Sequence, residues 1–271
     1  MALAERRHEI TEIGANPAPP TFANTIEAME RSGRMLDRVA RLFGVARENV
    51  TTPGYQELAR EWLPKITAAS DEIIFDRRLF DRIERVYTSR IEAGLMPDQQ
   101  RLVGLIYDNF VRRGARLAPE QMAQLTKINQ ELEALFAEFR ARVLADETKA
   151  TVLSSEADLA GLPDSLIASA VEAARERNDG SRWAIPNTRS SVDPFLTFSS
   201  RRDLREQVWR TFKSRGDNRD ANDTNAIILR IVRLRAERAS LLGYQTHAHW
   251  RLQDTMARTP ERARGLMLSV W

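Results

Sequence analysis

The sequence predicts a mainly α fold: a multi-helix domain with long antiparallel helices and a small β-ribbon insertion around residues 150–198. Three observations support this class. Apolar side chains recur three or four residues apart over several long stretches, turn residues separate these stretches, and only a few short runs are rich in β-formers. With 271 residues, of which 42% are hydrophobic, the chain can bury a sizeable core. We expect residues 1–271 to form a single helical domain, with residues 150–198 as a small α/β excursion within it.

The first helix is expected over residues 2–14, and the proline-rich stretch at residues 16–20 ends it. Proline lacks the backbone N–H donor and pushes the preceding residue out of the helical region. A second helix should begin at Asn24, where Glu27 is placed to complete a capping box. Its apolar face is interrupted at Gly33.

A third helix should begin at Pro53, because proline is favoured at the first helical position, and Pro64 should kink it. Helices follow at about residues 78–93 and 97–113, and then a long one at about 119–145. We expect this long helix to be a spine of the domain. Its apolar residues recur with helical spacing: Met122, Leu125, Ile128, Leu132, Leu135, Phe136, Phe139 and Val143.

The pattern then changes to short runs of β-formers. Strands are predicted at residues 150–153, 182–185 and 195–198, with a helix at about 164–177 between the first two. This ribbon should lie outside the main helical body. Helix is expected to resume at Ser200.

The strongest signal for a buried helix lies at residues 220–244, after a polar loop at 215–221. Asp223 or Asn225 can cap its first turn, and Gly243 is placed for a left-handed C-terminal residue. The apolar residues cover about half the circumference, which predicts packing on two sides. They are Ile227, Ile228, Ile231, Val232, Leu234, Ala239, Leu241 and Leu242.

Two more helices are predicted at residues 246–256 and 260–271. The last ends at Trp271 with no cap, glycine or polar tail. We therefore expect the domain to have been cut there, which would leave an apolar surface.

Arg235 and Arg238 fall inside the apolar arc of the 220–244 helix. An unpaired charge there costs several kcal/mol, so each should either pair with an acid or line a hydrated cleft. Two interpretations remain open. Both arginines can belong to a buried ion-pair network with neighbouring helices, or either can face a peptide channel and steer a substrate carboxylate.

Several segments carry a family resemblance: residues 16–33, residues 155–163, the 220–244 helix, and Met256 to Pro260. They resemble the N-terminal helical region of the peptidyl-dipeptidase and oligopeptidase (thimet oligopeptidase-like) family of zinc metallopeptidases. Within that family the likeness is greatest to the bacterial peptidyl-dipeptidases. The resemblance runs along nearly the whole chain but reaches no catalytic residue, and it implies a preceding segment as well.

A zinc peptidase of this kind needs H-E-x-x-H, which presents two imidazoles on one helical face with a glutamate to activate water. This motif does not occur here. The histidines are His8, His247 and His249, and the last two lie about 200° apart on a helix, so they cannot share a metal. We therefore expect no metal or cofactor in this chain; the resemblance implies zinc in the full-length family.

Other catalytic classes find little support. There is no G-x-S-x-G elbow and no glycine-rich phosphate loop. Paired acids such as Asp71-Glu72, or Asp217 with Asp220, arise by chance in a chain with 38 acidic residues. We therefore predict no catalytic residue.

Composition excludes further classes. Net charge is only +3, from 41 basic and 38 acidic residues, so we expect no nucleic-acid binding. No apolar run is long enough to span a bilayer, and no signal-peptide core is present, so we expect no membrane association. The chain has no cysteine, which fits the cytoplasmic location that we expect.

Two functional hypotheses follow. In the first, the chain is the N-terminal part of a zinc metallopeptidase that cleaves short peptides; it forms one wall of the substrate channel and is inactive without the zinc domain. In the alternative, it is a stand-alone helical scaffold, derived from that family, that binds a peptide or protein. Expected partners are short peptides, and either the missing catalytic domain or a second copy covering the cut end.

Overall fold

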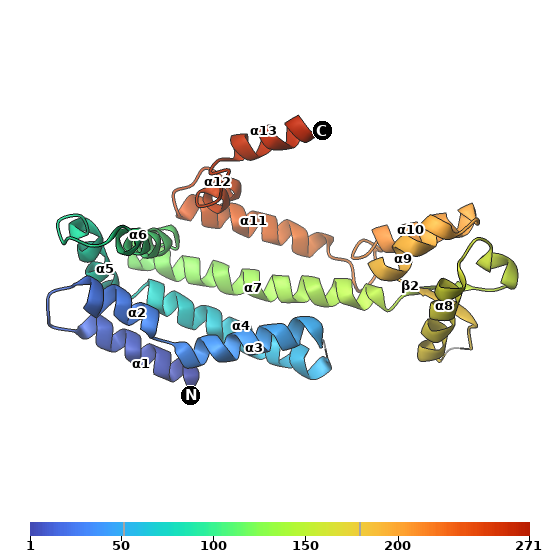
Figure 1. The fold of residues 1–271 in the computed structure, drawn as a ribbon, viewed down its shortest axis with the longest axis horizontal. Coiled ribbons are helices and arrows are strands. Elements are labelled where there is room, and N and C mark those ends of the chain that lie inside the picture. The colour runs from blue at the N-terminus through green and yellow to red at the C-terminus, as the bar shows by residue number, and fades with distance from the viewer. Residues whose placement is uncertain (51, 179) are drawn as a thin grey trace. The chain divides into compact units, whose positions relative to one another are not determined.

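The computed structural model describes residues 1–50, 52–178 and 180–271 (Figure 1). The predicted class, a mainly α fold with one small β-ribbon, is confirmed. The described residues divide into two compact units. The first comprises residues 1–134 and 232–271, and the second comprises residues 135–231.

Every regular element among the described residues of the first unit is a helix. Its elements are α1 (Ala2–Ala15), a π-helix (Phe22–Glu27), α2 (Ala28–Arg31), α3 (Arg34–Asn49), α4 (Pro53–Ile74), α5 (Arg77–Ser89), α6 (Pro97–Arg112), the first part of α7 (Pro119–Glu147), the end of α11 (Asn225–Leu241), α12 (His247–Leu252) and α13 (Pro260–Val270). The helices predicted from Pro53, and at 97–113 and 119–145, are confirmed. The predicted 246–256 helix is shorter than expected.

The helix expected to begin at Asn24 begins earlier. Thr21 is the capping residue: its hydroxyl accepts from the Asn24 amide at 3.2 Å, and the Asn24 side chain accepts from the Thr21 amide at 2.8 Å. The capping box predicted between Asn24 and Glu27 is therefore wrong, because a threonine hydroxyl three residues upstream takes the first free N–H group.

The proline-rich stretch is fixed by a buried arginine of α5. Arg82 donates to the carbonyl oxygens of Asn16 and Ala18 at 2.7 and 3.0 Å, and to the Asn24 side chain at 2.9 Å. Prolines leave carbonyl groups that no helix satisfies, and a guanidinium supplies several donors from one position.

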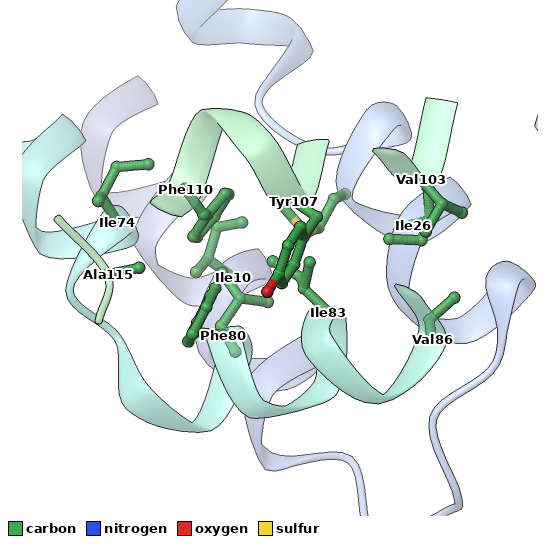
Figure 2. Packing of buried hydrophobic residues seen from close by; sticks show 12 residues of the cluster. Ile10, Ile26, Ile74, Phe80, Ile83, Val86, Val103, Tyr107, Phe110 and Ala115 are labelled. Atoms are coloured by element: carbon green, nitrogen blue, oxygen red, sulfur yellow. The ribbon is translucent and has the colours of Figure 1, made fainter. Parts of the chain in front are cut away.

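The core of the first unit lies between α1, α5 and α6 (Figure 2). Phe80 is buried in this core, and its ring centroid lies 6.1 Å from that of Tyr107 and 6.3 Å from that of Phe110. The other labelled residues of the same cluster are Ile10, Ile26, Ile74, Ile83, Val86, Val103 and Ala115. This core holds α6 in place. At the C-terminal end of α6 lie Arg112, its last residue, and Arg113 directly after it.

The second unit contains the β-ribbon. Strand β1 (Ala150–Leu153) pairs antiparallel with β2 (Trp183–Pro186), with Leu153 opposite Trp183. Around them lie a 3-10 helix (Glu156–Leu159), α8 (Asp164–Arg177), α9 (Arg189–Phe198) and α10 (Arg202–Lys213). Two of the predicted strands are therefore confirmed.

The strand predicted at residues 195–198 is wrong, because these residues end helix α9. Val192 and Phe195 are both buried and lie three residues apart, which places them on one helical face. Burial of that face against the ribbon outweighs the β-propensity of the individual residues.

The loop predicted at residues 215–221 is organised by one buried carboxylate at the end of α7. Asp146 is fully buried and accepts from the Gly216 amide at 2.8 Å, from Asn218 at 2.8 Å and from Asn222 at 3.1 Å, and its ion pair with Lys149 is 2.7 Å long. Burial alone would raise the pKa of Asp146, but these hydrogen bonds outweigh it and hold the pKa below its usual value.

Helix α11 is less buried than its sequence predicts. Ile227, Ile231, Leu234 and Ala239 are buried, whereas Ile228 and Val232 are 42% and 56% exposed. Packing on two sides is therefore wrong for this helix: one stripe is covered and its neighbour is open. The predicted left-handed end is confirmed, since Gly243 has a φ of 81°.

Candidate functional site

A polar cleft with a volume of about 450 Å³ lies in the first unit. Its lining comes from α4, α6, α7 and the end of α11, and from Trp250 and the residues that follow it. Charged and amide side chains dominate the lining. We call it the polar cleft.

One side centres on Asp71 of α4, which is buried. Asn129 of α7 donates to Asp71 Oδ2 at 3.0 Å, and Arg113 lies 3.5 Å from Asp71 Oδ1. Arg113 also donates to the Ser70 hydroxyl at 2.9 Å. Burial raises the pKa of Asp71, although Asn129 and Arg113 both act to lower it. The carboxylate is thus held by two partners in a poorly hydrated place.

A second cluster ties α12 to α6. Trp250 Nε1 donates to the Arg112 carbonyl, Arg112 Nη2 donates to the Trp250 carbonyl, and both distances are 3.0 Å. Arg112 also forms a hydrogen-bonded ion pair with Asp254, and the hydrogen bond from Arg112 lowers the pKa of Asp254. The indole is therefore fixed at the edge of the polar cleft.

Arg238 is the sequence-predicted residue that lines the polar cleft. It is partly buried, its Nη1 donates to Asn129 Oδ1 at 3.3 Å, and its guanidinium lies 4.5 Å from the centre of the Trp250 ring. Burial lowers its pKa, and the nearby Arg235 lowers it further. The predicted ion-pair network is absent at this arginine: among the described residues, no carboxylate lies within ion-pair distance of it.

Arg235 does not line the polar cleft, but it contributes charge nearby. It is partly buried and lies close enough to His247 to act on its ring. Burial, followed by the charges of Arg235, Arg238 and Arg251, lowers the pKa of His247 to about 4. His247 is therefore neutral at pH 7 in a positively charged environment. A substrate-channel role for Arg235 and Arg238 stays a prediction.

No residues here fit a catalytic metal. Within the described ranges there is no cluster of three or more His, Cys, Asp or Glu side chains arranged to hold an ion. His247 and His249 both lie on α12; the ring of His249 contacts the Thr246 hydroxyl at 2.8 Å and Glu261 at 3.8 Å.

The acid pair Asp71-Glu72 separates on folding. Asp71 faces the polar cleft, whereas Glu72 is exposed and pairs with Arg7 of α1 at 2.6 Å. Adjacent positions on a helix point about 100° apart, so such a pair seldom shares a site.

Sequence reasoning missed Asp71, Asn129 and Arg113 as members of the site. Asp71 and Asn129 are 58 residues apart, and nothing in the sequence brings them together. One signal was available: Asp71 lies three residues before the buried Ile74, so a charge occupies the inner face of α4.

The chain resembles peptidases along almost its whole length. It is 36% identical to "Dipeptidyl carboxypeptidase" of Escherichia coli over 269 residues, 99% of this chain. It is 28% identical to "Probable cytosolic oligopeptidase A" of Arabidopsis thaliana over 259 residues, and 25% identical to "Oligopeptidase A" of Salmonella typhimurium over 267 residues. The helical region that holds the polar cleft is thus a peptidase-related one.

The particular family follows from a second match. The model of Peptidase family M3 matches residues 195–270, which include α11 and α12. This chain is therefore a relative of the family M3 peptidases, as the resemblance predicted. It spans 40% of the Escherichia coli relative, 36% of the Arabidopsis one and 39% of the Salmonella one, so it corresponds to part of a peptidase.

Among the described residues, no helix is both long enough and apolar enough to cross a membrane.

Proposed function

We propose that this chain forms one wall of the substrate channel of a family M3 metallopeptidase that cleaves short peptides, and that it is inactive without a zinc-bearing part. The observation that carries the proposal is the polar cleft. It offers fixed charges and amides around a volume of about 450 Å³, which falls in the range of small-ligand sites. The cytoplasmic location stays a prediction of the same proposal.

The absence of catalysis in this chain is the second half of the proposal. Zinc peptidases need two imidazoles on one helical face, and the described residues provide no such group. Zinc would be held by the H-E-x-x-H segment of the other part, where it would activate the attacking water. This chain would then bind and align peptide rather than cleave it.

Three measurements on the 271-residue chain test this proposal. Atomic absorption should find no stoichiometric zinc, a chromogenic peptide should not be cleaved, and calorimetry should detect binding of short peptides. Addition of a separately expressed polypeptide that carries the H-E-x-x-H segment of a relative should give cleavage. Turnover by the chain alone, or no peptide binding, contradicts the proposal.

A specific observation also favours a protein partner. Four apolar side chains of α13 are largely exposed: Leu266 (68%), Met267 (70%), Leu268 (64%) and Val270 (81%). Leu266, Met267 and Val270 lie on one side of this helix, and Leu268 points about 200° away from Leu266, so exposed apolar side chains surround α13. Exposed apolar surface of this extent usually marks an interface. We propose that the zinc-bearing part of the peptidase covers α13, and a second copy is the alternative that fits a stand-alone scaffold.

Light scattering separates these two partners. If a second copy covers α13, the chain should be a dimer, and Leu268→Glu should make it monomeric. If the zinc-bearing part covers α13, the chain should be a monomer, and the same substitution should abolish complex formation with that part.

A further inference from the structure

Not every arginine that lines the polar cleft is paired with an acidic side chain. Arg113 is paired with Asp71, and Arg112 is paired with Asp254. Arg238 has no such partner among the described residues: it donates one hydrogen bond to Asn129 and lies over the face of Trp250. A guanidinium has five N–H donors, so most of those on Arg238 are unused.

The surroundings of Arg238 make its unpaired charge unfavourable in free energy. Arg238 is partly buried, and its Nε is buried with no hydrogen-bond partner. Arg235 and Arg251 add like charge nearby, and Glu133 acts on Arg238 only from beyond ion-pair distance. The Nδ1 atom of the neighbouring His247 is also buried without a partner. A partly buried cation beside other cations is stabilised by a bound anion.

The shape and the acids of the polar cleft limit which anion fits. Asp71, Glu133 and Asp254 also line it, so a doubly charged phosphate would meet three carboxylates. A singly charged, planar carboxylate matches the guanidinium fork and meets less repulsion. The volume of about 450 Å³ exceeds a lone ion and accommodates a short peptide.

We propose that Arg238 anchors a carboxylate site, in which the free carboxylate of a short peptide binds the guanidinium that Trp250 and Asn129 hold in place. Arg251, which is exposed and lines the polar cleft, adds attraction from the rim. This inference rests on the proposed function, because it names the chemical group that a channel-lining residue recognises.

Three peptides of one length distinguish the source of the carboxylate. Acetyl-trialanine has a free C-terminus, its C-terminal amide has none, and a third peptide replaces the last alanine of the amide with glutamate. We expect calorimetry on the 271-residue chain to show binding of acetyl-trialanine about tenfold tighter than binding of its amide. If the glutamate peptide binds as well as acetyl-trialanine, the site takes any carboxylate; if it binds like the amide, it selects the terminal one.

Substitutions at Arg238 and the NMR resonance of the His247 ring test where the carboxylate binds. Arg238→Gln should remove the tenfold preference, and Arg238→Lys should retain part of it because the charge remains. Arg233→Gln is the matched control: Arg233 is exposed on the same helix and does not line the polar cleft. Circular dichroism verifies that each variant is folded. Acetyl-trialanine should also shift the ring resonance of His247, and leave that of the exposed His8 unchanged.

The results separate this inference from the proposed function. Equal binding of acetyl-trialanine and its amide overturns the carboxylate site but leaves peptide binding intact. A folded Arg238→Gln chain that retains the preference also overturns it, and no binding of any of the peptides overturns both.

Discussion

Trp250 and Arg112 exchange hydrogen bonds with each other's backbone, although they are 138 residues apart in the chain. The indole N–H and the guanidinium each reach a carbonyl at 3.0 Å. Both carbonyls lie near a helix end, where helical bonding leaves acceptors free. The pair therefore joins two helix ends and fixes the aromatic face on which Arg238 lies.

Removal of Arg112 should detach α12. Arg112→Met takes away the hydrogen bond to Trp250 and the ion pair with Asp254, and we expect a loss of about 2 kcal/mol in the free energy of unfolding. Arg101→Met changes an exposed arginine on the same helix and should cost less than about 0.5 kcal/mol. Urea denaturation measures both. Equal effects of the two substitutions would show that the pair contributes nothing.

Asp146 should be the most sensitive acid of the second unit. Asp146→Ala leaves the Gly216 amide and two asparagine side chains without their acceptor in a buried place, and should cost about 3 kcal/mol or more. Asp193→Ala removes an exposed pair with Arg189 and should cost less than about 0.5 kcal/mol. Hydrogen exchange of the loop amides, measured beside urea denaturation, should increase in the first variant alone.

The same carboxylate predicts acid sensitivity. The folded pKa of Asp146 lies below its usual 3.8, so its contribution to stability is complete above that value. It is lost as the pH falls through the lowered pKa. Asp146→Asn should weaken this part of the acid transition.

Gly161 should not tolerate a side chain. Its φ is +86°, and an added Cβ would lie 2.5 Å from the Phe198 carbonyl oxygen. Gly161→Ala therefore combines backbone strain with a clash against main chain, and we expect a cost above about 2 kcal/mol. Gly94 has a similar φ of +66° with nothing within 4 Å, so Gly94→Ala isolates the strain, about 1 kcal/mol. Similar midpoints for both variants in thermal unfolding would contradict the clash.

His247 should make the chain less stable at mildly acidic pH. Its pKa is lowered to about 4 from 6.5, so the unfolded chain binds more protons than the folded chain between these values. Stability is complete above pH 6.5 and falls as the pH drops toward 4, by on the order of 1–2 kcal/mol after allowance for partial exposure. His247→Gln should reduce this slope in urea denaturation between pH 7 and pH 5. If the pH dependence of stability is unchanged in this variant, the surroundings of the His247 ring do not lower its pKa.

Long, regular patterns were the most predictable part of the fold. Leu125, Ile128 and Leu132 recur at helical spacing in α7, and all three are buried as expected. A helix that buries one face carries apolar residues at helical spacing, so the sequence alone reveals both the helix and its buried face. The segment ending at Phe198 was not predictable in this way, because packing against the ribbon decides between helix and strand there.

The candidate site was predictable only in part. Arg238 stood out because a charge in an apolar arc needs an explanation. Asp71 and Asn129 did not, since their roles arise from contacts over 58 residues that no local pattern encodes. The open stripe at Ile228 and Val232 was missed for the same reason: apolar character indicates the capacity to be buried and does not name the neighbour.

The side-chain amide of Asn129 has one fixed orientation in the polar cleft. Its amide N–H donates toward Asp71, and its amide oxygen accepts from Arg238. The two ends of an amide are chemically different, so only one orientation of this side chain satisfies both neighbours. Spontaneous deamidation would replace Asn129 by aspartate. The new carboxylate would repel Asp71 on one side and form an ion pair with Arg238 on the other. The loss of one nitrogen atom would thus leave Arg238 neutralised and unable to bind a peptide carboxylate.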